Sequence, residues 1–225
     1  MASWSALGLL LADGRLPSGG HSHSGTMEQA VDEGIVADVA NLAAFLEGRL
    51  ATTGRLDAHA AAETCRIRTA PDGEARLELL DAQIDARTVS PGARAASRRQ
   101  GGQYLRAAAH ALPGGSLAEL SARWPAGPHF AIALGAAAAA AGLEPIEAAR
   151  VAAYASVAAP ASAAVRLLGL DPATVTAALA ALMPACDDLA SEAAVSTPPL
   201  PVASAPIHDW LSESHATRRE RLFAS

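Results

Sequence analysis

Two histidines stand one residue apart in a stretch rich in glycine and serine, residues 16–25 (LPSGGHSHSG). His21 and His23 are residue types that bind zinc or nickel, and on an extended segment side chains at i and i+2 project from the same side. Both imidazoles can therefore reach one ion. A closed metal site needs further ligands, and the neighbouring side chains are serines. The pattern leaves two alternatives: a transient or shared metal site, or loop histidines that are exposed or hydrogen-bonded.

The same stretch lacks the chemistry of a nucleotide enzyme. Gly14 and Gly19 have the spacing of a phosphate-binding loop, but Gly20 and His21 stand where that loop needs Lys and Ser or Thr. All 17 basic residues of the chain are arginine, so a pyridoxal phosphate Schiff base is excluded as well. No cluster of histidine, carboxylate and nucleophile is recognisable. The sequence therefore predicts that the chain is not an enzyme.

Local signals at the end of this stretch predict the start of a helix. Thr26 and Gln29 have the spacing of a capping box, and Glu28 is placed to complement a helix N-terminus. The glycines before them permit positive φ and the close approach of another backbone. We therefore expect a structured turn that leads into a helix.

Helix breakers divide the rest of the chain into pieces of helical length. Motifs such as TTG at 52–54, APDG at 70–73 and LPGG at 112–115 separate segments whose apolar residues keep helical spacing. Asp38 is a predicted N-cap. Two apolar stripes are Val39, Leu42, Ala43, Leu46 and Leu50, and Leu77, Leu80 and Ile84. No segment alternates with a period of two, so we predict an all-α fold of about ten helices.

Length and breakers favour a single domain at residues 1–225. Within it we expect a compact body at 1–195, a proline-rich linker at 196–206 (STPPLPVASAP) and a C-terminal arm at 207–225. The arm carries an apolar pair beside basic side chains, a composition common at protein interfaces. We expect an arm that is mobile alone and becomes ordered on a partner, with Phe223 in a partner's pocket. The alternative is an amphipathic helix that folds back on its own domain.

Composition restricts the remaining classes of function and cellular location. The formal net charge of −6 argues against a general nucleic-acid binder. The apolar window at 127–142 is too short for a membrane span. Cys65 and Cys186 have no CxxC partner and are expected to be buried free thiols in a reducing compartment. We therefore expect a cytoplasmic protein that binds neither nucleic acid nor a membrane.

Three further features allow both a structural and a functional interpretation. Arginines surround the glycine pair at 101–102 and form either a solvated surface or a face for docking a partner. An alanine run at 136–141 predicts a buried, tightly packed helix or a dimer interface. Arg166 lies in an apolar helix and needs a carboxylate or carbonyl partner if it is buried. The arginines of the basic face are Arg94, Arg98, Arg99 and Arg106.

Five segments resemble, in order, motifs of the UreF family of urease accessory proteins. The first is LLLADGRLPSGGHSHSGTMEQAV, and the others are ARAASRRQGGQYLRAA, HFAIALGAAAAAAGL, ASAAVRLLGLD and SHATRRERLFAS. The matching positions of the first motif are Leu11, Ala12, Asp13, Pro17, Gly19, His23, Ser24 and Glu28. Leu16 and His21 replace family phenylalanines, Met27 replaces a leucine, and Asp171-Pro172 replaces Gly-Gln. Because His21 is not a typical family residue, the histidine pair is a poor basis for a family metal site.

The resemblance implies an all-α, homodimeric, non-catalytic scaffold without a resident cofactor. It implies that the protein binds UreD (also called UreH), that the two recruit the GTPase UreG, and that the assembly delivers nickel to apo-urease, with nickel passing transiently. The alternative function is a direct nickel carrier that uses His21 and His23. The residues expected to bind partners are Gly19, His23, Ser24, Glu28, Arg98, Arg99, His215, Arg218, Arg219, Arg221, Leu222 and Phe223.

Overall fold

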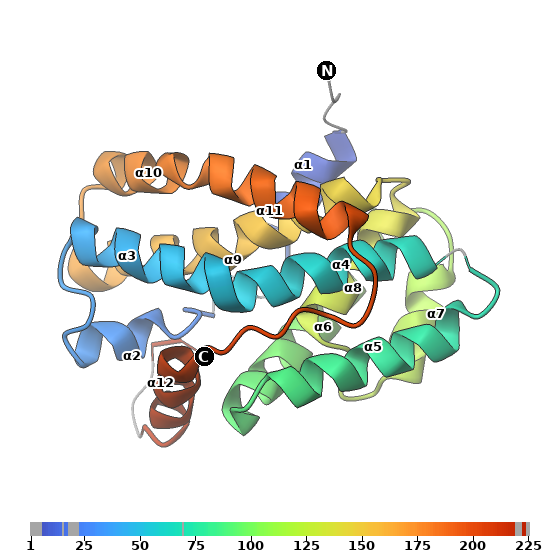
Figure 1. Ribbon diagram of the computed structural model, residues 1–225, viewed down its shortest axis with the longest axis horizontal. Coiled ribbons are helices and arrows are strands. Elements are labelled where there is room, and N and C mark those ends of the chain that lie inside the picture. The colour runs from blue at the N-terminus through green and yellow to red at the C-terminus, as the bar shows by residue number, and fades with distance from the viewer. Residues whose placement is uncertain (1–5, 15, 18–22, 69, 219–221, 224–225) are drawn as a thin grey trace.

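The computed structural model describes residues 6–14, 16–17, 23–68, 70–218 and 222–223 (Figure 1). Over these residues the chain is helical and contains no strand, so the predicted all-α fold is confirmed. Its elements are α1 (Ala6–Ala12), α2 (Met27–Asp32), α3 (Val39–Arg49), η2 (Leu50–Gly54), α4 (Arg55–Ile67), α5 (Gly73–Arg87), α6 (Pro91–Ala111), α7 (Ser116–Arg123), α8 (Phe130–Ala140), α9 (Pro145–Leu168), α10 (Pro172–Ala181), α11 (Met183–Val195) and α12 (Pro206–Ala216).

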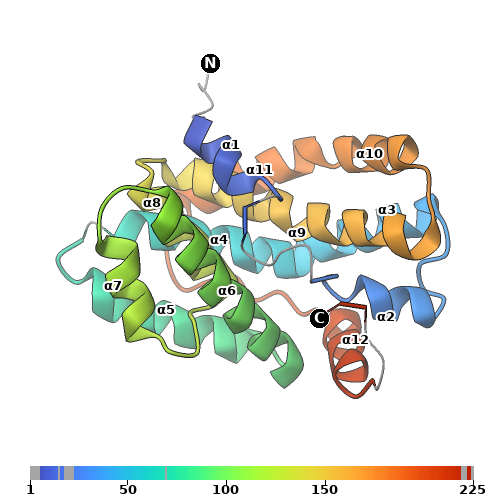
Figure 2. The same ribbon diagram turned by 180° about the vertical axis from the view of Figure 1, so that it is seen from behind.

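Helices α4 and α9 form the centre of the fold, and α8 and α11 pack against both (Figures 1 and 2). Small side chains allow this close packing. A Cβ at Gly135 of α8 would lie 2.4 Å from the carbonyl oxygen of Ala61 of α4, so only glycine fits there. Ala136, Ala137 and Ala138 of the alanine run are buried. This part of the run is the tightly packed helix that the sequence predicts, whereas Ala139, Ala140 and Ala141 are only partly buried.

Several predicted local features are confirmed. The side chain of Asp38 accepts a hydrogen bond from the backbone N–H of Asn41 at 2.8 Å and caps α3. Leu77, Leu80 and Ile84 are all buried on one face of α5. Hydrophobic periodicity and capping chemistry therefore locate these elements correctly.

The predicted break at residues 52–54 is wrong, because the helix continues through it. A π-helical turn, η2, joins α3 to α4, and the continuous helix runs from 39 to 67. A Cβ at Gly54 would lie 2.7 Å from the hydroxyl oxygen of Ser156 on α9, so glycine permits close packing here. A π turn adds one residue to a helical turn, and such turns are frequent at functional sites.

The C-terminal segment returns to the body of the protein. Residues 196–205 carry no helix and run alongside α5 before α12 begins (Figure 1). The guanidinium of Arg87 donates to the carbonyl of Leu200 at 2.9 Å, and the side-chain oxygen of Gln83 accepts the N–H of Leu200 at 3.1 Å. The side chain of Leu200 is buried. The linker and α12 therefore pack on the body, as in the alternative of an arm that folds back on its own domain, and not as in the expected arm that is mobile alone.

Two helical stretches, Pro145–Leu168 and Pro172–Val195, are long and apolar enough to cross a membrane by length and composition alone. Half of the apolar window of the first stretch is buried inside the protein. The same property is expected of a core helix, and α9 is the central helix of this fold.

Candidate functional site

The two ends of the chain meet at one buried carboxylate, that of Glu28 in the first turn of α2. Its Oε2 lies 2.8 Å from Nε2 of His215 on α12. Its oxygens also accept the backbone N–H groups of Leu222 at 2.8 Å and Phe223 at 3.2 Å. We call these four residues the Glu28 junction. The structure thus brings together candidate residues that are almost 200 positions apart in the sequence.

Electrostatics favour the ionised form of Glu28. Burial alone raises the pKa of this carboxyl, but the N–H of Leu222, the imidazole of His215 and the N–H of Phe223 all act in the opposite direction. Their combined effect holds the pKa of Glu28 below its usual value. The ionised carboxylate can only accept, so His215 is the donor in their contact, and such charge-assisted bonds are stronger than neutral ones.

The turn before α2 depends on left-handed backbone conformations. Gly25 has φ of 59° and Thr26 has φ of 71°. A Cβ at Gly25 would lie 3.3 Å from two guanidinium atoms of Arg49. The predicted positive φ is therefore confirmed at Gly25, and the predicted close approach involves a side chain rather than a second backbone.

The predicted capping box between Thr26 and Gln29 is wrong. The left-handed conformation of Thr26 turns its hydroxyl onto the carbonyl of Gly25, and the amide of Gln29 donates to Glu33 instead. The hydroxyl of Ser24 accepts the N–H of Glu28 at 3.3 Å, in place of the predicted cap.

The C-terminal arm fills a pocket of its own domain. The ring of Phe223 is buried, and the guanidinium carbon of Arg166 lies 4.6 Å from the ring centroid, a cation–π contact. Arg218 forms an ion pair with Asp32 of α2. The expectation that Phe223 enters a partner's pocket is therefore wrong for this structure, because the protein supplies the pocket itself. Leu222, in contrast, is 80% exposed.

The expected basic face divides into internal and external arginines. One guanidinium nitrogen of Arg98 lies 2.6 Å from Asp81 and 2.7 Å from Asp85. His129 lies 2.9 Å from Asp85 and joins the same network. Asp81, Asp85 and His129 lie close enough together to hold a metal ion, but the guanidinium of Arg98 is bonded to both carboxylates, and that of Arg94 lies 3.9 Å from Asp85. Arg99 is exposed, so only part of the predicted face is available to a partner.

The histidine pair is only partly described. His23 is 5% exposed and forms contacts within the protein, so its imidazole is not a surface ligand. Ser24 is fully buried beside it. The other predicted site residues, Gly19, His21, Arg219 and Arg221, lie outside the described residues.

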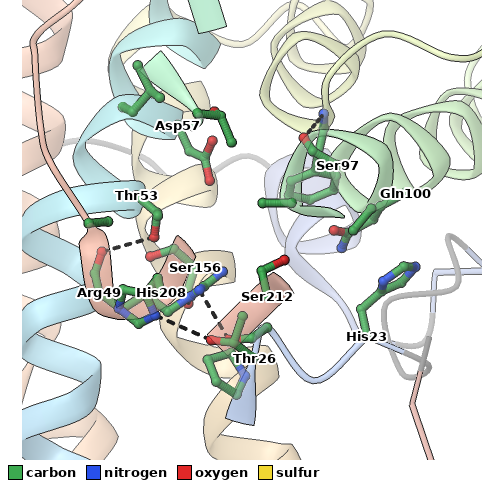
Figure 3. A pocket seen from close by; sticks show the side chains of 18 of the residues that line it. His23, Thr26, Arg49, Thr53, Asp57, Ser97, Gln100, Ser156, His208 and Ser212 are labelled. Atoms are coloured by element: carbon green, nitrogen blue, oxygen red, sulfur yellow. Dashed lines mark hydrogen bonds between the residues drawn. The ribbon is translucent and has the colours of Figure 1, made fainter. Parts of the chain in front are cut away.

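A cavity that the sequence does not predict lies next to the turn (Figure 3). It has a volume of about 160 Å³ and is lined by residues of the turn, of the linker, and of α3, η2, α4, α5, α6, α8, α9 and α12. Arg49 and Asp57 contribute the opposite charges of its wall, and His208 of α12 lies against Thr26 at its edge. No known sequence motif marks this set, because most of its members come from separate segments that meet only after α12 folds back.

Comparison with known proteins identifies relatives over the full length of the chain. The model of the UreF family matches residues 36–183. A protein of Mycolicibacterium vanbaalenii named urease accessory protein UreF is 44% identical over 226 residues, which covers 100% of both chains. Proteins of the same name from Mycobacterium marinum and Mycobacterium tuberculosis are 41% and 40% identical, over 98% and 96% of this chain and 98% and 97% of theirs.

Proposed function

Since the chain belongs to the UreF family, we propose that it acts in urease maturation as a scaffold that binds UreD/UreH, recruits the GTPase UreG with it, and assists nickel insertion into apo-urease. The chain is an accessory protein rather than an enzyme. A scaffold works through surfaces, so the proposal needs an exposed surface that the fold holds in place.

The outer face of the C-terminal arm is the observation that carries this proposal. Ile207 and Trp210 on α12 are 59% and 49% exposed, although both are large and apolar. Leu222, further along the arm, is also exposed, and Arg218 is half-buried with its ion pair to Asp32. Exposed aromatic and apolar side chains next to arginine are typical of protein interfaces. The Glu28 junction fixes this face relative to the body.

Co-purification tests the proposal. We expect Trp210→Glu and Ile207→Glu to abolish capture of UreD/UreH and to reduce urease activation in cells, while the helix content stays unchanged. Leu79→Glu is a matched control, because Leu79 is 62% exposed on α5. Capture at wild-type strength by both arm variants, or equal loss in the control, would overturn the role of this face.

We also propose that the protein forms a homodimer in solution. The buried alanines of α8 cannot supply the interface, whereas most alanines of α10 are exposed. Light scattering of the purified chain should then give twice the monomer mass. A monomer at every concentration, both alone and with UreD/UreH, contradicts the homodimer.

In this proposal nickel is cargo, the protein holds no resident cofactor and it works in the cytoplasm. The buried position of His23 disfavours the alternative of a direct carrier. Calorimetry with nickel distinguishes them: tight stoichiometric binding that is lost in His21→Ala/His23→Ala would favour the carrier over the scaffold.

A further inference from the structure

The cavity beside the turn has a charged wall built by the irregular helix. Arg49, Thr53 and Asp57 follow one another at intervals of four residues across the π turn, and all three line the cavity (Figure 3). Side chains at intervals of four residues lie on one face of a helix. The sequence Arg-x-x-x-Thr-x-x-x-Asp therefore presents a guanidinium, a hydroxyl and a carboxylate to the same space.

Arg49 is held in position with part of its donor capacity unused. Its Nε donates to the carbonyl of Ser156 at 2.8 Å, and Nη1 donates to the carbonyl of Gly25 at 3.2 Å. Nη2 forms no hydrogen bond with any other residue that the structure describes. A planar guanidinium fixed by two carbonyls offers its remaining N–H groups in a defined direction.

Asp57 is the second group with unused capacity. Its carboxylate forms no hydrogen bond and no direct ion pair with another described residue, although the charge of Arg49 acts on it across the cavity. Burial raises the pKa of Asp57 to about 6, and the attraction of Arg49 only partly opposes this. The other titratable or charged groups that line the cavity are His23 of the turn, Arg87 of α5, and His208 and Asp209 of α12.

Neighbouring charges make a cation an unsuitable occupant. Burial and the nearby charge of Arg49 lower the pKa of His208 to about 3, so this imidazole is neutral. Asp209 is engaged by the N–H of Ser90 at 3.1 Å, and Arg87 by the linker carbonyls. Asp57 is then the one available carboxylate among the described lining residues, and Arg49 repels a metal ion from it.

Much of the remaining wall is apolar. The apolar residues that line the cavity include Leu56, Ile84, Ala96, Phe130 and Pro160. A space of this size is comparable to cavities that bind a benzene-sized molecule. A polar end with one guanidinium and one carboxyl, next to apolar walls, fits a small ligand with one polar and one apolar end.

We propose that this cavity binds a short-chain monocarboxylic acid. The carboxylate of the ligand lies between Nη2 of Arg49 and the protonated carboxyl of Asp57, and its apolar tail contacts Leu56, Ile84 and Phe130. Two adjacent carboxylates share one proton. Below pH about 6 Asp57 already carries that proton, and above it the site takes up one proton when the ligand enters as an anion. The site goes beyond the scaffold role, and either proposal can fail without the other.

Calorimetry of the full-length protein with sodium acetate between pH 5.5 and 7.5 tests the site, with sodium phosphate as the comparison anion. We expect saturable 1:1 binding of acetate that weakens by up to tenfold per pH unit above about 6. Phosphate should bind at least tenfold more weakly, since the apolar walls do not solvate its additional oxygens. Absence of saturable acetate binding at pH 5.5, or tighter binding of phosphate, would overturn the proposal.

Three variants locate the ligand. Asp57→Asn should retain acetate binding but remove its pH dependence, because the amide donates at every pH. Ala96→Leu should reduce affinity at least tenfold by filling the cavity without a change of charge. Arg49→Met should abolish binding. If this variant fails to fold, Asp57→Asn and Ala96→Leu still test the site. Asp188→Asn, on the exposed surface of α11, is the control. Unchanged binding in Asp57→Asn and Ala96→Leu places acetate elsewhere and contradicts the site.

Discussion

Glu28 and Asp57 are two carboxylates beside the same turn, and their surroundings have opposite effects. Glu28 accepts three hydrogen bonds from the C-terminal arm, and its pKa lies below the usual value. Asp57 accepts none from the described residues, and burial raises its pKa to about 6. Burial acts in the same direction on both, so the hydrogen bonds decide the difference.

Glu28 is a structural carboxylate, whereas Asp57 is a carboxylate that is available to a ligand. The carboxylate of Glu28 accepts three hydrogen bonds, and these hold the two ends of the chain together. The carboxylate of Asp57 accepts no hydrogen bond from the described residues and lies beside a cavity. The first arrangement stabilises the fold and positions a surface, whereas the second destabilises the native state slightly and leaves a site for a ligand.

The largest effect is expected from Glu28→Ala. The variant leaves buried His215 and two backbone N–H groups without their acceptor, so the free energy of unfolding should fall by about 3 kcal/mol. Urea denaturation at pH 7 measures it. Glu47→Ala, on the exposed side of α3, should stay within about 0.5 kcal/mol of the wild type. An equal loss in both variants would show that the Glu28 junction contributes nothing specific.

The next effect concerns the apolar pair of the arm. Phe223→Ala should lower the free energy of unfolding by about 2 kcal/mol, since the ring is 7% exposed and packs under Arg166. Leu222→Ala should change it by less than about 0.5 kcal/mol, because that side chain is exposed. Similar values for the two variants in the same denaturation experiment would argue against the docked arm.

A smaller effect of opposite sign is expected from Asp57→Asn. The folded protein keeps a proton on Asp57 up to pH of about 6, whereas the unfolded chain releases it near 3.8. The native state therefore binds more protons between these values, and stability falls as pH rises through this window. The variant should be more stable than the wild type at pH 8 and equal to it at pH 3.5. Thermal denaturation at both pH values measures this, and a stabilisation that is the same at both contradicts it.

The contribution of Glu28 to the free energy of unfolding depends on pH with the reverse sign. Its folded pKa lies below the usual 4.5, so its contribution to stability is complete above that value and is lost as pH falls through the folded pKa. The difference in unfolding free energy between the wild type and Glu28→Ala should accordingly shrink as the pH falls below 4.5. A difference that stays constant down to pH 3 would show that the charge of Glu28 is not involved.

Sequence patterns predict the parts of this molecule that depend on neighbours in the chain. Asp38 caps its helix, Gly25 has positive φ, and the stripe that contains Leu77 faces the core. Each of these follows from spacing or from one residue's conformational preference. Glu28 was also identified as a candidate, but as a residue that faces a partner.

The parts that were not predicted depend on distant contacts. The π turn carries the helix through TTG, because Gly54 packs against α9, which lies 100 residues further along the chain. The prolines of the linker suggested a detached arm, but Arg87 and Gln83 bind the linker backbone. The spacing of Arg49 and Asp57 marks no known motif, and the cavity forms only when eight helical elements, the turn and the linker are assembled.

Amide hydrogen exchange at Leu222 and Phe223 tests the central claim most directly, since both N–H groups donate to Glu28. In the full-length wild-type protein without partners we predict protection of these amides and of α12, with exchange slowed at least about a hundredfold relative to an unstructured chain. The protection should be lost in Glu28→Ala and kept in Glu47→Ala. Exchange of both amides at the rate of an unstructured chain in the wild type would show a detached arm and contradict the account.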